Sequence, residues 1–308
     1  MGSNGRDLGF GQCQTHSTHR RGTSMTILVT AASGQLGRLV LDSLLARGVA
    51  PGDVRAGART PDALADHAER GVDVVHLDYD DEATVAAAVK GVDRVLLISG
   101  TEMGRRVDQH RGVIDAAAAA GVGHLVYTSA PKADDTTLVL APEHRATEEL
   151  VRASGVPFTI LRNNWYAENY VPDLLAARET GTLVTSVGEG RVASAARADY
   201  AEAAAVVLTE PGHEGRVYEL AGDRAWTFDV LASALGEVLG REVALHQVSS
   251  EERVALLEGA GVDAGTAGFV AALDANIRDG ELATADGALS RLIGRPTTSL
   301  VDALRPLA

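Results

Sequence analysis

The chain has 308 residues, of which 28 are Lys or Arg and 42 are Asp or Glu, so its formal net charge is −14. An average surface of this charge repels phosphate backbones and anionic lipid, which argues against nucleic-acid and membrane partners. Hydrophobic residues make up 45% of the chain and aromatic residues 4%. This balance predicts a globular core of helices packed closely on a sheet rather than an aromatic-rich β-sandwich.

Cysteine content and apolar runs narrow the class of protein further. Cys13 is the sole cysteine, which excludes an internal disulfide and a cysteine-based metal site and favours a cytoplasmic location. No apolar run reaches the roughly 20 residues that a membrane-spanning helix needs. Residues 1–24 are polar and lack the apolar stretch of a signal peptide, so we expect a tail before a folded domain that starts at Met25.

From Met25 onward, short β-branched runs alternate with longer helical patterns, which is typical of βαβ units. The first predicted helix places Val40, Leu41, Leu44 and Leu45 on one face. The strands are nearly continuous in Val, Ile and Leu, as a sheet with helices on both faces requires. We therefore predict an α/β fold with a Rossmann-type, doubly wound parallel sheet. The predicted strands are 26–30, 54–58, 72–77, 94–99, 124–128 and 158–162, and the later predicted helices are 61–70, 82–89, 107–120 and 142–154.

The alternation of strand and helix patterns changes after Asn163. An aromatic segment, 165–170, precedes a helix near Leu174 and a β-like stretch over 182–195, while 217–220 is predicted to rejoin the sheet. From Thr227 onward the pattern is mostly helical, with one strand at 243–248. We expect residues 25–163 and 191–222 to form the Rossmann-type domain, and residues 164–190 and 223–308 to form a smaller, mostly helical lobe.

The segment from Thr30 to Gly37, T-A-A-S-G-Q-L-G, stands between the first predicted strand and helix. It is a G-x-x-G-x-x-G turn with Ala31 in place of the first glycine. Gly34 lets backbone N–H groups approach a pyrophosphate at the helix N-terminus, and Gly37 lets the helix pack closely on the strand. A tight βα turn can need glycine for geometry alone, but the strand before it and the helix after it favour dinucleotide binding.

The end of the second predicted strand distinguishes the two nicotinamide cofactors. An acidic residue there would bind the ribose 2′-OH of NAD, whereas an arginine suits the 2′-phosphate of NADP. Arg59 occupies this place, and its planar guanidinium matches a phosphate. An ordinary solvated arginine is the alternative. The sequence favours NADPH over NADH.

The Tyr-x-x-x-Lys pair with which short-chain dehydrogenases protonate a carbonyl is missing. His144 stands at the lysine place and Leu140 at the tyrosine place. A ketone needs its alkoxide protonated, whereas a quinone accepts hydride without that help, because the quinol has a pKa near the ~10 of tyrosine. His144 or Tyr166 would then be an optional proton donor, and His144 has an equal claim to a structural role in its helix. No histidine spacing indicates a metal, and no Ser-His-Asp arrangement indicates hydrolysis.

Several segments resemble the NmrA-like atypical short-chain dehydrogenases/reductases, and within them the type 2 NADPH:quinone oxidoreductases and the triphenylmethane reductases. These segments are 30–37, 96–99, 127–129, 143–144, 161–170, 193–200, 218–222 and 293–298, so the resemblance runs from Met25 to the C-terminus. It implies NADPH on the Rossmann domain, hydride transfer to quinones or dye-like acceptors, and a cleft roofed by the C-terminal lobe.

The site residues follow from the matching positions. His144 and Tyr166 are the candidate catalytic residues, and no metal is expected. The expected cofactor contacts are Ala31, Ser33, Gly34, Gln35, Leu36, Arg59, Ser99, Gly100, Thr128, Asn163, Asn164 and Trp165.

Two departures from the family pattern put the acceptor in question. Ala31 stands where the family usually has glycine, and Asn164 stands where the quinone reductase motif has glycine, so the backbone near the nicotinamide can differ. A tailoring reductase of an aromatic polyketide or other natural product, and a non-catalytic NmrA-like dinucleotide sensor, are the alternative functions. An alternative to a binding role exists for the aromatic segment: packing in the core or in a lid could explain Trp165, Tyr166 and Tyr170. The expected partner is a small aromatic or quinone-like molecule, with a homodimer left open.

Overall fold

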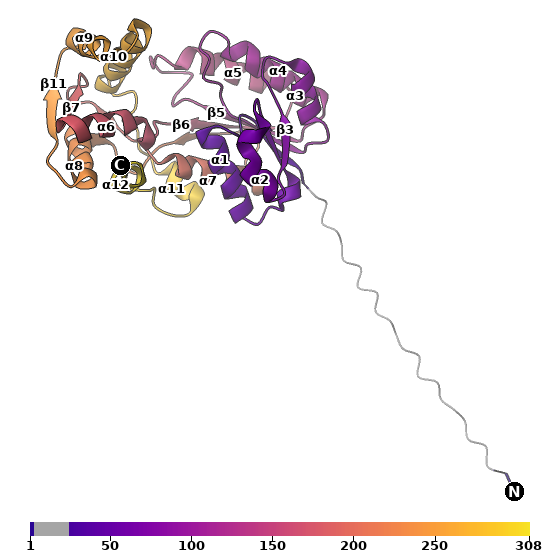
Figure 1. Cartoon of the computed structure of the whole chain (residues 1–308). Helices are drawn as coiled ribbons and strands as arrows, with labels where there is room; N and C mark the ends of the chain where they lie inside the picture. The colour runs from indigo at the N-terminus through magenta and orange to yellow at the C-terminus, as the bar shows by residue number, and fades with distance from the viewer. Residues whose placement is uncertain (3–24) are drawn as a thin grey trace.

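The computed structural model describes Met1, Gly2 and residues 25–308, and its centre is a seven-stranded parallel sheet (Figure 1). The strand order is β3-β2-β1-β4-β5-β6-β9, so the doubly wound Rossmann-type fold is confirmed. Cys13 and most of the predicted tail lie outside the described residues. The strands are β1 (Ile27–Val29), β2 (Val54–Ala58), β3 (Asp73–His76), β4 (Arg94–Leu97), β5 (His124–Ser129), β6 (Phe158–Asn163) and β9 (Arg216–Leu220).

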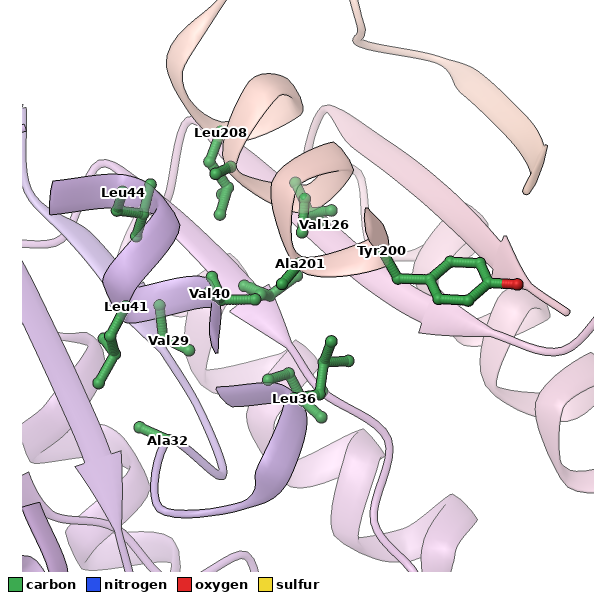
Figure 2. Close-up of a cluster of buried hydrophobic side chains, with 14 of the residues drawn as sticks. Val29, Ala32, Leu36, Val40, Leu41, Leu44, Val126, Tyr200, Ala201 and Leu208 are labelled. Carbon is green, nitrogen blue, oxygen red and sulfur yellow. The ribbon is translucent and has the colours of Figure 1, made fainter. Parts of the chain in front are cut away.

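Helices cover both faces of this sheet. Successive side chains of a strand point to opposite faces, and here both sets are apolar and buried against helices. Ile27 and Val29 join the core under α1 and α7, and Leu28 joins the core under α3, α4 and α5. Figure 2 shows the first core, with Val40 and Leu44 of α1 facing Ala201 and Leu208 of α7. The helices are α1 (Gln35–Ala46), α2 (Ala65–Glu69), α3 (Glu82–Val89), α4 (Arg106–Ala119), α5 (Ala141–Ala153) and α7 (Arg197–Thr209), with 3₁₀ turns at Pro51–Asp53 and Pro61–Leu64.

Two predicted elements differ in the structure. The strand expected over 94–99 ends at Leu97, because the next N–H groups leave the ladder: Ile98 donates to Thr30 Oγ1 at 3.0 Å and Ser99 to Thr128 Oγ1 at 2.9 Å. The helix expected over 61–70 begins as a 3₁₀ turn, and only Ala65–Glu69 is α-helical.

The C-terminal lobe has its own core, in which Trp226, Phe228 and Leu273 are buried. The expected β-like stretch over 182–195 is two short strands in different sheets: β7 pairs in parallel with β11, and β8 pairs antiparallel with β10. Within the described residues, no helix is long and apolar enough to cross a membrane. The elements are 3₁₀ turn η3 (Ala167–Tyr170), α6 (Val171–Thr180), β7 (Thr182–Thr185), β8 (Arg191–Val192), β10 (Trp226–Thr227), α8 (Phe228–Leu239), β11 (Ala244–Gln247), α9 (Ser250–Gly259), α10 (Ala264–Arg278), α11 (Ala288–Ile293), α12 (Leu300–Leu304) and a final 3₁₀ turn (Arg305–Leu307).

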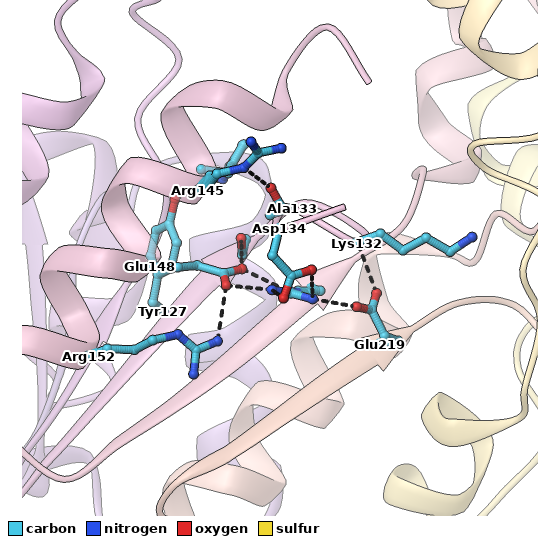
Figure 3. A network of polar contacts seen from close by, with 11 residues as sticks. Tyr127, Lys132, Ala133, Asp134, Arg145, Glu148, Arg152 and Glu219 are labelled. Carbon is cyan, nitrogen blue, oxygen red and sulfur yellow. Dashed lines mark hydrogen bonds and ion pairs between the residues drawn. The ribbon is translucent and has the colours of Figure 1, made fainter. Parts of the chain in front are cut away.

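A buried ion-pair network holds the carboxyl ends of β5, β6 and β9 together (Figure 3). Arg162 of β6 lies 2.6 Å from Glu148 of α5, 2.9 Å from Asp134 and 2.9 Å from Glu219 of β9. Burial lowers the pKa of Arg162, but its hydrogen bonds to these carboxylates outweigh burial and raise that pKa above its usual value. One guanidinium thus links the loop after β5, helix α5 and strand β9.

His124 on β5 gives the stability of the fold a pH dependence. Its Nε2 lies 2.8 Å from Thr159 Oγ1, whose hydroxyl donates to the carbonyl of His213 at 2.6 Å, so the imidazole donates to Thr159. Burial lowers the pKa of His124 to about 4, from 6.5. Between these values the unfolded chain binds a proton that the folded chain does not, so the free energy of unfolding falls as the pH falls.

We expect His124→Gln to reduce this pH dependence, because glutamine keeps a donor for Thr159 but does not titrate. The slope of unfolding free energy against pH should fall by up to about 1.4 kcal/mol per unit between roughly pH 6 and 4. Urea denaturation across this range measures it. His246→Gln, on the exposed side of β11, is the control. Equal slopes in the two variants would contradict the assignment.

Candidate active site

The turn between β1 and α1 leaves a helix N-terminus open. Gly34 is the N-cap of α1, and no side chain caps the helix, so the N–H groups of its first turn are available to a phosphate. A Cβ on Gly37 would lie 2.6 Å from Ala31 O and from Ala32 Cα, so only glycine lets α1 approach the turn this closely. The local backbone fits a dinucleotide pyrophosphate.

Ala31 adopts the left-handed conformation that the family's glycine would take freely. Its φ is +46°, a region that costs an alanine roughly 1–2 kcal/mol. The turn therefore places a non-glycine residue in a conformation that glycine adopts without this cost.

A cavity of about 220 Å³ lies beside this turn, at the carboxyl ends of β1, β2 and β4. Arg59 reaches it from the end of β2, with 68% of its side chain exposed and its Nη1 3.2 Å from Glu102 Oε1. An exposed guanidinium beside the turn suits a 2′-phosphate, which would compete with Glu102. The residues lining this cavity are Ala31, Ser33, Gly34, Arg59, Leu77, Asp78, Tyr79, Ser99, Gly100, Thr101, Glu102 and Gln109.

Tyr79 is a part of this wall that the sequence analysis did not identify. Its hydroxyl donates to the carbonyl of Ile98 at 2.7 Å and lies 2.5 Å from Thr30 Oγ1. It thereby ties the end of β4 to the end of β1. Its position in the sequence could have identified it, because Tyr79 follows the third predicted strand just as Arg59 follows the second. Both therefore lie at the carboxyl edge of the sheet, where ligands bind.

A second cavity, of about 520 Å³, continues the first toward the C-terminal lobe. Both are lined by Ala31, Gly34, Ser99, Gly100 and Thr101, so they form one continuous cleft. The predicted residues that line the second cavity include Gln35, Leu36, His144, Asn163, Asn164, Trp165 and Tyr166. Every predicted site residue except Thr128 thus lines one of the two cavities, and their binding roles remain predictions.

Thr128 lies behind the wall of the cleft. It is buried, and its Oγ1 accepts the N–H of Ser99 at 2.9 Å. The next N–H, from Gly100, donates to His110 Nε2 at 3.0 Å. Thr128 and His110 therefore shape the Ser99–Gly100 segment from the side away from the cleft.

His144 and Tyr127 form a buried pair on the second cavity. His144 Nδ1 lies 2.8 Å from the Tyr127 hydroxyl. Burial, with a smaller contribution from the charge of Arg106, lowers the pKa of His144 to about 3. The imidazole is therefore neutral near pH 7. In the tautomer in which Nδ1 accepts from the Tyr127 hydroxyl, the ring proton is on Nε2, where it can donate a hydrogen bond.

Tyr166 is held on three sides. Its hydroxyl accepts from Asn163 Nδ2 at 3.3 Å, its ring packs edge-on against Tyr200, and the Arg197 guanidinium lies 4.6 Å from the ring centroid. Burial raises the pKa of its hydroxyl. A phenol fixed in this way can orient a ligand, and it releases its proton less readily than tyrosine in water.

Asn164, at the second departure from the family pattern, links the two parts of the fold. Its backbone N–H donates to Leu220 O at 2.8 Å, and its side-chain Nδ2 donates to Leu282 O at 3.2 Å. Its Oδ1 accepts the N–H of Trp165 at 2.7 Å. Glycine could make only the backbone contact, so this asparagine fixes the chain beside the cleft.

Comparison with known proteins identifies the family. A family model described as NAD(P)H-binding matches residues 31–211. Quinone oxidoreductase 2 of Escherichia coli (strain K12) is 44% identical over 281 residues, which cover 91% of this chain and 98% of that protein. The chain belongs to the NAD(P)H-binding, NmrA-like atypical short-chain dehydrogenases/reductases.

Two solved structures of family members are similar throughout. The NADPH complex of the E. coli quinone oxidoreductase has a TM-score of 0.88 and 44% identity, covering 92% of this chain and 99% of that one. The NADP(H) complex of Citrobacter sp. triphenylmethane reductase has a TM-score of 0.87 and 38% identity, covering 92% and 100%. The uncapped helix, the turn and Arg59 fit the cofactor that both contain.

Proposed function

We propose that the protein is an NADPH-dependent reductase that delivers hydride to a quinone or a related conjugated aromatic acceptor. The observation that carries the proposal is the neutral, buried His144 on the acceptor side of the cleft, in a chain without a Tyr-x-x-x-Lys pair. Such a site lacks the tyrosine–lysine pair with which short-chain dehydrogenases protonate an alkoxide, and a quinone accepts hydride without that pair. The similarity to a quinone reductase along nearly the whole chain supports the same acceptor class.

Residues at different positions along the cleft would bind different parts of the cofactor and the acceptor. The N–H groups at the start of α1 would hold the pyrophosphate, and Arg59 the 2′-phosphate. When bound, NADPH supplies the hydride. Ser99, Gly100 and Asn163 would border the cofactor, and Tyr166 would orient the acceptor. His144 Nε2–H would donate a hydrogen bond to an acceptor oxygen, with water as the final proton source.

The proposed partner is a small aromatic molecule, and the proposed setting is the cytoplasm. The net charge of −14 disfavours a polyanionic partner. Sedimentation of the purified chain would show whether it acts as a monomer or a homodimer.

We expect neither His144→Ala nor Tyr166→Phe to abolish quinone reduction. Each should lower kcat by less than ~10²-fold, the lower end of general acid–base contributions, because the quinol needs no strong acid. Steady-state NADPH oxidation with 1,4-naphthoquinone measures this, after NADPH binding has been verified for each variant. A loss above ~10³-fold would instead indicate a carbonyl reductase with a relocated acid, since an unprotonated alkoxide in a dry cleft is costly.

We expect Arg59→Ala to remove most of the preference for NADPH over NADH. Losing one charged contact to the 2′-phosphate is worth about 1.5–3 kcal/mol, or roughly 10- to 10²-fold in the ratio of kcat/KM values. Glu102→Gln should act in the opposite direction, because it releases Arg59 from its carboxylate partner. Arg70→Ala, an exposed arginine paired with Asp42, is the control. Equal use of both cofactors by the parent protein would refute the role of Arg59.

A further inference from the structure

A third cavity, of about 830 Å³, lies at the C-terminal lobe, where η3, α6, α9 and α10 supply most of its lining and Gln35 and Arg197 the side toward the sheet. Its wall is largely apolar and includes Trp165, Leu257, Val262, Phe269 and Val270. We call it the lobe chamber. The chamber is separate from the cavity of about 520 Å³ beside His144, where the reacting ring is proposed to lie.

The lobe chamber adjoins the acceptor side of the cleft. Gln35, Trp165, Asn169 and Arg197 line both cavities. A molecule whose ring lies beside His144 can therefore extend past Trp165 into the chamber. Pockets of several hundred Å³ with apolar walls and a few polar groups are typical of sites for small organic ligands.

The charged groups of the chamber leave a negative excess. Arg253 lies 3.8 Å from both Asp173 and Asp274, beyond hydrogen-bond distance in each case. Asp274 Oδ2 accepts from the N–H and the hydroxyl of Ser186, at 3.0 and 2.8 Å. The single positive charge of Arg253 thus faces the negative charges of two carboxylates.

Asp173 is the carboxylate left open to a ligand. No described side chain donates a hydrogen bond to it, and 25% of its side chain is exposed. Burial raises its pKa to about 6, with Arg253 opposing and Asp274 adding to the shift. Glu168, another carboxylate of the lining, already accepts the backbone N–H of Arg197, at 2.9 and 3.0 Å from its two oxygens. The polar end of the chamber therefore favours a cation or a strong hydrogen-bond donor.

We propose that the lobe chamber is a second binding subsite, which takes an apolar substituent of the acceptor that ends in a basic amine paired with Asp173. The proposal rests on the proposed function for the position of the ring, whereas the chamber and its charge are features of the described residues alone. The apolar walls select the length of the substituent, and Asp173 selects its end group.

Three naphthoquinones with the same long alkyl chain, ending in methyl, amine or carboxylate, test this subsite. Their dissociation constants are measured by calorimetry, with quenching of tryptophan fluorescence as a second readout because Trp165 lines the chamber. The amine should bind at least ~10-fold more tightly than the methyl compound at pH 7.5, and the carboxylate more weakly. Equal affinities for the three in the parent protein would overturn the proposal, without recourse to any variant.

Asp173→Asn should reduce the amine-to-methyl affinity ratio to about one. Asp229→Asn, an exposed acid in the first turn of α8 as Asp173 is in that of α6, should keep the ratio of the parent. An amine preference that survives Asp173→Asn in a folded variant would also overturn the proposal. Turnover of unsubstituted naphthoquinone separates the two hypotheses. Turnover without an end-group preference defeats the subsite alone, and Asp173-dependent binding without any quinone turnover defeats the proposed function alone.

Discussion

Replacing Gly34 by valine should weaken NADPH binding by at least ~10²-fold while the fold stays intact. An ideal Cβ at Gly34 would lie 3.2 Å from Ala31 O, and Gly34 lines both cavities of the cleft. A branched side chain there would stand between a phosphate and the N–H groups that begin α1. Hydrogen bonds to charged groups contribute about 1.5–3 kcal/mol each, so losing two of them costs roughly 10²- to 10⁴-fold in affinity.

Calorimetric titration with NADPH measures this effect, and thermal unfolding verifies the fold. Gly52→Val is the matched control, because a Cβ at Gly52 has nothing within 4 Å. It should bind NADPH as the parent does. If Gly34→Val binds NADPH as tightly as Gly52→Val, the pyrophosphate does not lie at this helix N-terminus.

Replacing Arg162 by methionine should lower the free energy of unfolding by about 3–5 kcal/mol, the cost of breaking a buried ion pair from one side. The cause is Glu148, whose side chain is 4% exposed and would keep its charge beside only one partly exposed arginine, Arg152. Asp134 and Glu219 would lose the same partner (Figure 3). The wall formed by α5 and the loop after β5 should loosen with it.

Urea denaturation measures this loss, and Arg152→Met provides the comparison. Arg152 pairs with the same Glu148 but is 42% exposed, so its removal should cost less than about 1 kcal/mol. Adding Glu148→Gln to Arg162→Met should restore part of the stability, because it removes the unpaired charge. Equal losses for the two arginine variants would show that the network does not carry this stability.

The sheet could be predicted from the sequence because a strand buried on both faces appears as a run of consecutive apolar residues. Ile27, Leu28 and Val29 are consecutive and all fully buried, a pattern that only a strand covered on two sides requires. The turn from Thr30 to Gly37 could be predicted for a similar reason, since Gly37 has no space for a Cβ. Both features depend on residues that are close in the sequence.

The parts that were missed depend on contacts between distant segments. The sequence places Thr128 at the end of a strand but does not show that its hydroxyl faces the backbone of Ser99 rather than the cleft. Likewise, β7 pairs in parallel with β11 from about 60 residues later in the chain, and the lobe chamber forms where α6, α9 and α10 come together. No local pattern carries that information.

The most direct test of the central claim is NADPH consumption by the purified protein with 1,4-naphthoquinone, followed at the NADPH absorbance band beside NADH and an isolated aromatic ketone. The account predicts rapid oxidation of NADPH by the quinone, slower oxidation of NADH, and little turnover of the ketone. Tight binding of NADPH without oxidation by any quinone, or turnover of the ketone in preference to the quinone, would contradict it.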